Sequence, residues 1–301
     1  MKVSIITLTL DKPEFFGEAM ASIPAASPVD IEHIVVHDGD PTFAEEIARC
    51  YPATKIVMGD GKGATAALAR GVEAATGDFL LILHSDDRLG PEALGRLAEC
   101  ASARPEVLIW TGYAHVFRVG KNGEEITERW LRGRSTTELS LPNICDDVPL
   151  LTARFCHRSL FHRFGNYDPE FSECSDREFL LRLYMAGVMD APLDVLVSSL
   201  RLHDRSRTIN TRQNWVPPYL AEHIELAGRW LKKDGVNLET RRFLRNWRAR
   251  EILRLCYYNY RAGNLLKAIR IALSAEISDP LWGFRALSVL RASQYRQRSD
   301  V

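Results

Sequence analysis

Short apolar runs alternate with helical segments over the first hundred residues, and this alternation limits what the chain can fold into. Four runs, at 3–10, 31–37, 54–59 and 79–83, are wholly apolar or rich in β-branched residues, and each has the length of a strand. Strands that alternate with helices form right-handed βαβ units and a mostly parallel sheet. Such strands are buried on both faces, which explains their continuous apolar character. The sequence therefore predicts an α/β fold with a mostly parallel, Rossmann-like sheet flanked by helices.

The helix predicted over 63–77 consists almost entirely of small residues. Leu68 and Val72 share one face, and Gly71 lets the backbone approach the sheet closely. Gly77 is the expected C-cap, because glycine readily adopts the backbone conformation that ends a helix. We therefore expect this helix to pack tightly against the sheet.

The length and the change of pattern along the chain predict two parts. The chain has 301 residues, 46% of them hydrophobic, which suffices for one large domain and an extension. Strand patterns stop near residue 217, and helical patterns continue. We predict an α/β domain over 1–215, with halves of about 1–105 and 106–215, and a helical extension over 216–301. The sequence has neither a signal-peptide pattern nor a run near the ~20 apolar residues of a membrane helix, so we expect a cytoplasmic protein.

Acidic and basic residues are unevenly distributed, although the net charge is zero. Residues 241–301 contain 13 Lys and Arg against 4 Asp and Glu, and the rest of the chain contains 26 against 35. Arginine and aromatic residues on helices suit the surface of an anionic membrane, and basic helices also suit an acidic protein domain in the same chain or in a homodimer. The sequence leaves these alternatives open and does not favour nucleic acid as a partner.

Carboxylates stand directly after three of the predicted strands. Asp86 and Asp87 follow the strand over 79–83, Asp38 follows the second strand, and Asp11 follows the first. In an open parallel sheet, ligands bind outside the carboxyl ends of the strands. Two adjacent carboxylates repel each other unless a cation neutralises them, and oxygen ligands suit Mg²⁺ or Mn²⁺ shared with a substrate phosphate. Asp38 can accept from a pyrimidine N3–H or a ribose hydroxyl. An ordinary turn or helix cap is the alternative at each position.

A further helix is predicted to begin at Ser175, because Ser175-Asp176-Arg177-Glu178 has the form of a capping box. Asp176 then lies in the first turn on the inward face, where the helix dipole keeps a carboxylate ionised. Glu178 and Arg182 are spaced to pair on the outer face. A structural first-turn acid is the alternative for Asp176.

Four segments, in this order and spacing, resemble the family 2 glycosyltransferases, which have the GT-A fold. They are "VSIITLTLDKPEFF", "IVVHDGD", "GKGATAALARGVEAATGDFLLILHSDD" and "ECSDREFLLRLYMAG", and the similarity covers roughly residues 1–205. The resemblance implies inverting transfer of a sugar from a nucleotide sugar to an acceptor hydroxyl. The QxxRW pattern of processive polysaccharide synthases is missing, which favours the addition of a single sugar.

The resemblance also implies roles for individual residues. Thr9 and Asp38 hold the nucleobase, and Ser85-Asp86-Asp87 corresponds to the DXD-type metal motif, with Asp86 near the ribose or the metal and Asp87 as the direct metal ligand. Asp176 is implied to be the general base, with Glu173 as the alternative. Asp11 and Lys62 are expected to bind the nucleotide, and His203 the metal or the diphosphate. The residues expected to neutralise the leaving nucleotide are Arg201, Arg205 and Arg207.

Three positions depart from the family pattern. His84 stands where an acidic residue is frequent, and Ala66 and Ala69 stand where the helix usually carries a polar Asp or Asn. These departures keep open a non-catalytic nucleotide-sugar-binding or scaffold protein of the same fold. A nucleotidyltransferase is a second alternative, but "TLTLDKPEFF" lacks the Gly-rich, Lys- or Arg-bearing loop expected after its first strand.

The resemblance implies partners as well. The expected cofactor is Mn²⁺ or Mg²⁺. Asp38 favours a pyrimidine base, so a UDP-sugar is the expected donor and a dTDP-sugar the next, while a GDP-sugar stays open. The acceptor is a glycan or a lipid-linked sugar in the assembly of cell-surface glycans or glycolipids. Such acceptors favour a location at the inner face of the membrane, which the basic tail would contact.

Overall fold

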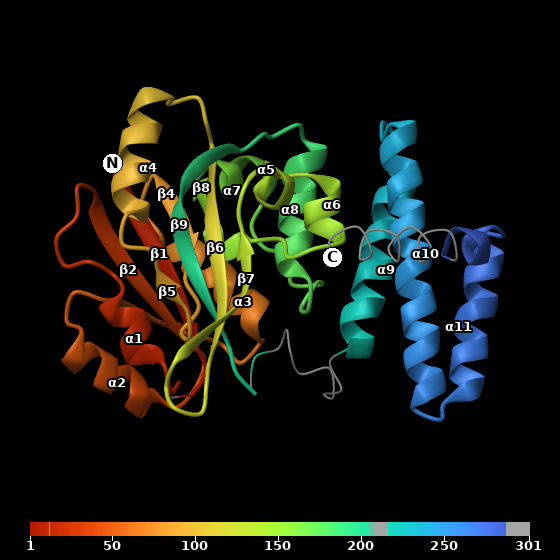
Figure 1. The fold of residues 1–301 in the computed structure, drawn as a ribbon, viewed down its shortest axis with the longest axis horizontal. Helices are drawn as coiled ribbons and strands as arrows, with labels where there is room; N and C mark the ends of the chain where they lie inside the picture. The colour runs from red at the N-terminus through yellow and green to blue at the C-terminus, as the bar shows by residue number, and fades with distance from the viewer. Residues whose placement is uncertain (12, 205, 207–215, 287–301) are drawn as a thin grey trace. The chain divides into compact units, whose positions relative to one another are not determined.

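The structure is a computed structural model, and it describes residues 1–11, 13–204, 206 and 216–286 (Figure 1). The chain forms two compact units, Met1–Asn210 and Thr211–Val301. The first unit holds the strands, and the described part of the second is helical. The domain boundary that the sequence predicts after residue 215 stays a prediction.

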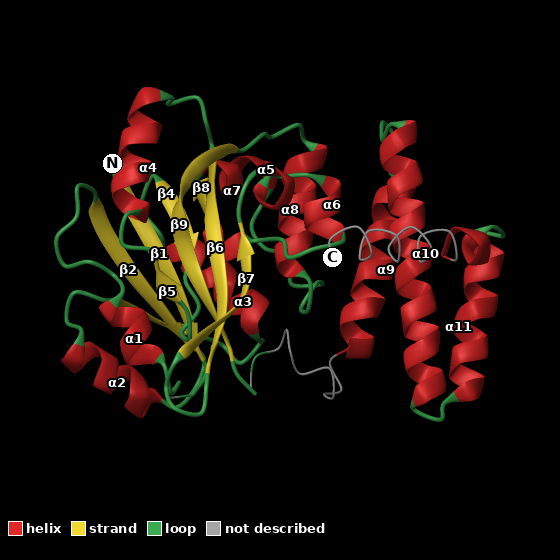
Figure 2. Cartoon of the chain, viewed as in Figure 1, coloured by secondary structure: helices red, strands yellow, loops and turns green. Residues whose placement is uncertain are grey.

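One sheet forms the centre of the first unit (Figure 2). Its strands are β1 (Lys2–Thr9), β2 (Asp30–His37), β3 (Lys55–Met58), β4 (Phe79–Ile82), β5 (Arg88–Leu89), β6 (Ile109–Val119), β7 (Glu125–Leu131), β8 (Arg154–His157) and β9 (Ala191–Leu202). Their order is β3-β2-β1-β4-β8-β6-β9-β5, and β7 pairs with β6. The first four strands pair in parallel and match the four predicted runs. The predicted α/β fold is confirmed, although β8 runs antiparallel to β4 and β6, and β5 and β7 are also antiparallel.

Helices pack on both faces of this sheet. They are α1 (Phe16–Ala21), α2 (Pro41–Cys50), α3 (Ala64–Ala74), α4 (Ala93–Ala103), α5 (Arg134–Thr137), α6 (Leu141–Cys145), α7 (Ser159–Phe164) and α8 (Ser175–Met185), with a short 3₁₀ turn at Leu151–Ala153. Leu97 of α4 joins the core cluster that contains Val3 and Ile5 of β1. Gly71 of α3 approaches Ile6 instead, and side chains alternate between the faces of a strand. The two helices therefore cover opposite faces of β1.

The predicted C-cap of α3 is wrong. The helix ends at Ala74, and Ala75 follows as the C-cap in an extended conformation. Gly77 lies against β1 instead, because a Cβ atom there would stand 2.6 Å from the backbone nitrogen of Ser4. There is no space for a side chain at residue 77. Glycine is therefore required because its backbone lies so close to that of β1, and not because the helix end needs a left-handed conformation.

Gly71→Ala is expected to destabilise the first unit by about 1–3 kcal/mol through overpacking. A Cβ atom at Gly71 would stand 2.5 Å from Cγ2 of Ile6 and 3.2 Å from Cγ2 of Val36, both in the buried sheet. The control is Gly95→Ala in α4, where the nearest atom would be Cγ of Pro28 at 3.9 Å. There the higher helix propensity of alanine should stabilise by up to about 1 kcal/mol. Urea denaturation measures the change in the free energy of unfolding for both variants. Equal changes for the two substitutions would contradict the close approach of Gly71 to the sheet.

The second unit contains α9 (Val216–Lys232), α10 (Leu238–Arg261) and α11 (Leu265–Ser278), and α10 packs against both of the others. Leu226, Leu244 and Trp247 are buried between them. Glu251 is also fully buried in α10, and burial opposes its ionisation, but hydrogen bonding with His223 and the neighbouring arginines outweigh this and lower its pKa to about 2. None of the described helices combines the length and the apolar composition needed to cross a membrane.

Candidate functional site

The turn after β4 brings Asp86 next to the end of β9. Asp86 Oδ2 lies 2.9 Å from Nε2 of His203, the residue that follows β9. The two side chains are 28% and 25% exposed, so solvent and ligands can reach both. They stand 117 residues apart, and the pairing of β5 with β9 brings them together. A carboxylate oxygen and an imidazole nitrogen this close can share one cation.

Asp87 has a different environment from Asp86. It is 4% exposed, and its Oδ1 accepts the backbone N–H of Arg201 at 2.8 Å. Burial, and next the charge of Asp86, raise the pKa of Asp87 well above its ordinary value. The geometry therefore favours Asp86, rather than Asp87, as the carboxylate that meets a ligand.

The side chain of Arg201 supports this turn from inside the protein. It is 5% exposed, and its Nε donates to the backbone oxygen of Asp86 at 3.2 Å. Its guanidinium pairs with Glu18 and lies 4.1 Å from the ring centroid of Phe15 and 5.0 Å from that of Phe117. The guanidinium of Arg201, which the sequence predicts to neutralise the leaving nucleotide, is thus surrounded by two aromatic rings and a carboxylate of the protein.

At the end of β2, Asp38 holds the loop that leads into α3. Its Oδ1 accepts the backbone N–H of Gly61 at 2.7 Å. A Cβ atom at Gly59 would stand 2.1 Å from the same oxygen, so the loop passes directly over the carboxylate. A carboxylate has two oxygens, and Oδ2 can still accept from a ligand.

The other predicted nucleotide contacts differ in accessibility. Thr9 is buried, and its hydroxyl lies 2.9 Å from Nδ1 of His37, so its side chain supports the strand end. Asp11 is exposed and lines, with His37, a cavity of about 370 Å³ beside the start of α2. Lys62 is exposed and pairs with Asp60 at 3.0 Å. Asp11 and Lys62 can therefore reach a ligand at this edge.

His84 is exposed two residues after the end of β4, and its backbone oxygen accepts the N–H of Asp87 at 3.1 Å. Nothing in the structure explains why histidine stands at this position. Two other candidates, Arg205 and Arg207, lie outside the described residues.

α8 carries Asp176 in its first turn. The predicted capping box is wrong, because Cys174 is the N-cap and no side chain caps the helix. Glu178 pairs instead with Arg182, as their spacing predicts, but both side chains are largely buried rather than on an outer face. Asp176 is half-buried, and its Oδ1 accepts the backbone N–H of Arg177 at 2.7 Å.

The chain before α8 is anchored to α3. The hydroxyl of Thr65 donates to the backbone oxygens of Phe171 at 3.1 Å and Ser172 at 3.4 Å. The side-chain amide of Asn166 donates to the backbone oxygen of Ala69 at 2.9 Å. Because α3 begins at the loop that the end of β2 holds, these bonds bring the start of α8 toward the carboxyl edge of the sheet.

The start of α8 also holds the segment between β7 and β8. Arg177 is buried, and its guanidinium donates to the backbone oxygen of Ile144 and, at 2.9 Å, to that of Asp147.

Glu173, the alternative base, is half-buried three residues before Asp176.

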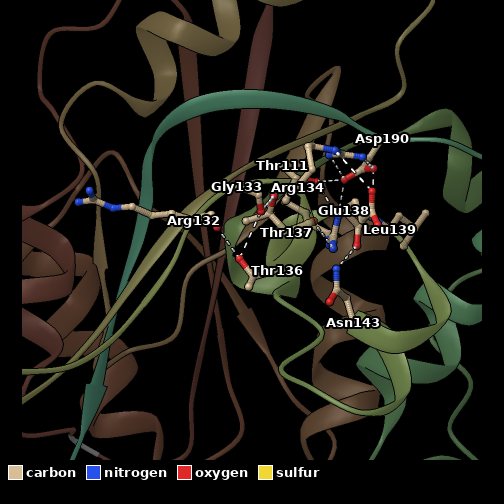
Figure 3. Close-up of polar contacts among 11 residues, drawn as sticks. Thr111, Arg132, Gly133, Arg134, Thr136, Thr137, Glu138, Leu139, Asn143 and Asp190 are labelled. Atoms are coloured by element: carbon tan, nitrogen blue, oxygen red, sulfur yellow. Dashed lines mark hydrogen bonds and ion pairs between the residues drawn. The ribbon is translucent and has the colours of Figure 1, made fainter. Parts of the chain in front are cut away.

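An ion-pair network centred on the buried Asp190 fixes the same segment from the sheet side (Figure 3). Arg154 of β8 and Arg134 of α5 meet the two oxygens of Asp190 at 2.8 and 2.6 Å. The hydroxyl of Thr111 and the backbone N–H of Leu139 also donate to this carboxylate, at 2.6 and 3.0 Å. Burial opposes the ionisation of Asp190, but these contacts outweigh it, and its pKa lies below the ordinary value.

Sequence reasoning missed Arg154 and Asp190 as supporting residues, and it missed the contact of Arg201 with Glu18, because the partners are distant in the chain. Arg154 and Asp190 are 36 residues apart, and Arg201 and Glu18 are 183 residues apart. One local signal for the network was Arg154, a cation in the strand sequence RFCH. A charge buried in a strand requires a partner of opposite charge, so this residue predicts that an acid lies near it.

Comparisons with known proteins agree with this fold. Residues 4–164 match the family model described as Glycosyl transferase family 2. Uncharacterized glycosyltransferase Rv1514c of Mycobacterium tuberculosis is 28% identical over 187 residues, which is 60% of this chain and 68% of that protein.

Two solved structures share the fold. The structure of S. aureus TarS 1-349 in complex with UDP has a TM-score of 0.60 and 17% identity, over 99% of this chain and 92% of that one. The mannosyltransferase PcManGT from Pyrobaculum calidifontis, in complex with GDP-Man and Mn²⁺, has a TM-score of 0.55 and 16% identity, over 97% and 85%. The longer TarS structure extends further, and this chain spans 44% of it. The family model covers more than half of the 301 residues, and the GT-A-type fold agrees with it, so the chain belongs to the family 2 glycosyltransferases.

Proposed function

We propose that this glycosyltransferase moves one sugar from a UDP-sugar to an acceptor hydroxyl, with inversion at the anomeric carbon and with a bound divalent cation. The observation that carries the proposal is the contact between Asp86 and His203 at the carboxyl edge of the sheet. Family membership supports a sugar transferase over a nucleotidyltransferase or a non-catalytic scaffold.

The residues present fit a divalent cation. Carboxylate oxygen and imidazole nitrogen are both ligands of Mn²⁺, and Mg²⁺ usually combines one or two carboxylates with substrate phosphates. Within the described residues no three His, Cys, Asp or Glu side chains cluster as a complete ligand set, so the donor diphosphate and water would have to complete the shell. Asp86 and His203 would hold the cation, with Asp87 as a buried support. A cation bound there would stabilise negative charge on the departing nucleoside diphosphate.

Asp176 is the residue that we propose as general base. It would accept the proton of the acceptor hydroxyl while the acceptor oxygen bonds to the anomeric carbon and the bond from that carbon to the diphosphate breaks. Its place at the start of α8 supports this role, because Thr65, Asn166 and Arg177 fix the surrounding chain by hydrogen bonds to backbone oxygens. Glu173 remains the alternative.

Asp38 supports UDP as the nucleotide of the donor, because its Oδ2 can accept the N3–H of a pyrimidine. The fold alone leaves this choice open, since structures of this fold hold UDP-GlcNAc in TarS and GDP-Man in PcManGT. Asp11 and Lys62 are the further contacts proposed for the nucleotide.

For the acceptor we propose a glycan or a lipid-linked sugar in the assembly of cell-surface glycans, at the cytoplasmic face of the membrane. The basic helices after residue 216 are the feature of this chain that supports such a location. The catalytic domain is proposed to end near residue 215.

Asp86→Ala is expected to abolish the stabilisation of the protein by UDP together with Mn²⁺. A ligand at a hundred times its Kd stabilises a protein by about 2.7 kcal/mol, and the variant should show almost none of this in thermal denaturation. Asp30→Asn, an exposed acid at the opposite end of β2, is the control and should behave as the unmodified protein. If Asp86→Ala kept the stabilisation and Asp87→Ala lost it, Asp87 would be the ligand after all.

A further inference from the structure

α11 presents an apolar stripe to solvent. Leu266, Ile269 and Leu273 are 76%, 46% and 60% exposed, and their spacing of three and four residues places them on one face of the helix. Ala268 and Ala275 are buried on the other face, where α11 packs on α10. We call the three exposed residues the α11 stripe. Further exposed apolar or aromatic side chains stand near its two ends: Tyr257, Tyr260, Leu265, Leu281 and Phe284.

Basic residues predominate in the sequence that carries the α11 stripe and most of α10. Residues 241–275 contain nine Arg and Lys and a single acidic residue, Glu251, and Glu276 and Asp279 follow directly. Glu251 is fully buried, and two arginines pair with it, so it adds no negative charge to the surface. Lys267 and Arg270 stand beside the stripe and are exposed. This face therefore suits a partner that carries negative charge.

A cavity at the end of the second unit combines cationic and apolar groups. Its volume is about 320 Å³, and its lining consists of Arg242, Asn246, Leu281, Phe284 and Arg285. Arg285 pairs with Asp279 at 3.3 Å, and Arg242 is exposed. A guanidinium group binds phosphate oxygens through paired N–H donors. Phe284 and Leu281 remain mostly exposed beside them. A phosphate next to an acyl chain, as in a phospholipid, matches this combination.

We propose that the α11 stripe, the basic residues around it and this cavity form a docking face for the surface of an anionic lipid bilayer. Helices with exposed apolar residues flanked by Lys and Arg lie in the bilayer interface and bind more strongly as the anionic lipid content rises. A second copy docked through the same stripe would bring Lys267 and Arg270 of both copies together, and like charges oppose that contact. The inference rests on the membrane location proposed above and deepens it, and it uses no residue of the proposed transfer site.

Co-sedimentation of the full chain with vesicles tests this proposal. The protein should sediment with vesicles of phosphatidylcholine and phosphatidylglycerol, less with phosphatidylcholine alone, and less as salt is raised. The variant Leu266→Ser/Ile269→Ser/Leu273→Ser should lose binding, and its exposed positions leave the core unchanged. Lys267→Gln/Arg270→Gln should weaken binding about thirtyfold, because each basic residue near an anionic surface contributes about a factor of five.

The matched control is Val119→Ser/Met189→Ser, which removes exposed apolar side chains of the first unit and should bind vesicles like the unmodified protein. Equal binding of the stripe variant, or no sedimentation with phosphatidylglycerol vesicles at low salt, would overturn the proposal. It would also be overturned if the stripe variant only converted a dimer into a monomer in light scattering. Asp176→Asn should still bind vesicles, and the stripe variant should still bind nucleotide. These two results keep a failure of membrane binding distinguishable from a failure of the proposed transfer reaction.

Discussion

Asp176→Asn is expected to lower the rate of sugar transfer by about 10²- to 10⁴-fold, the contribution typical of a general base. Asparagine keeps the shape of the side chain and its hydrogen bond from the N–H of Arg177 but cannot accept the acceptor proton. The donor contacts proposed here come from other elements, so nucleotide-sugar binding should persist. Turnover of a UDP-sugar panel, measured with a titration of donor binding, separates the two quantities.

Glu173→Gln is the matched control for this experiment, because it neutralises a half-buried acid three residues earlier. It should retain most of the transfer rate if Asp176 is the base. Retained turnover in Asp176→Asn together with its loss in Glu173→Gln would move the role to Glu173. Loss of donor binding in Asp176→Asn would show that the residue acts on the donor instead.

Asp190→Ala is expected to destabilise the first unit by about 3–5 kcal/mol, because it leaves Arg154 buried without its counter-ion. Arg154 is 1% exposed, and its charge cannot escape to water without disrupting β8. Since the pKa of Asp190 lies below its ordinary value of 3.8, the stabilisation is complete above that pH and is lost as the pH falls through the lower folded-state pKa. Denaturation midpoints at neutral and acidic pH measure both effects.

Glu128→Gln provides the comparison, because it breaks the ion pair with Arg118 in which both side chains are well exposed. An exposed pair contributes about 0–1 kcal/mol, so this variant should unfold close to the unmodified protein. Similar losses for the two variants would mean that Asp190 stabilises the fold no more than a surface charge does.

Much of the first unit could be predicted because burial leaves a local pattern. β4 is apolar and buried throughout, and residues 3–7 of β1 are buried, since neighbouring strands and helices cover both of their faces. β3, at the edge of the sheet, is only partly buried. The same pattern places Asp38 and Asp86 at the carboxyl edge, where the structure has them. Gly71 was predicted from the small residues around it, and the approach to Ile6 confirms its place against the sheet.

The sequence by itself determined the α/β class, the strands that converge on one polar edge and the family to which the chain belongs. Only the tertiary structure decided that Asp86 meets His203 while Asp87 is buried against Arg201, and that the predicted pair of Glu178 and Arg182 is largely buried rather than on an outer face. Burial repeats with the period of a strand or helix and can be read locally. The partner of a charged side chain depends on which distant strands become neighbours. In this chain the order of the strands in the sheet determines these neighbours.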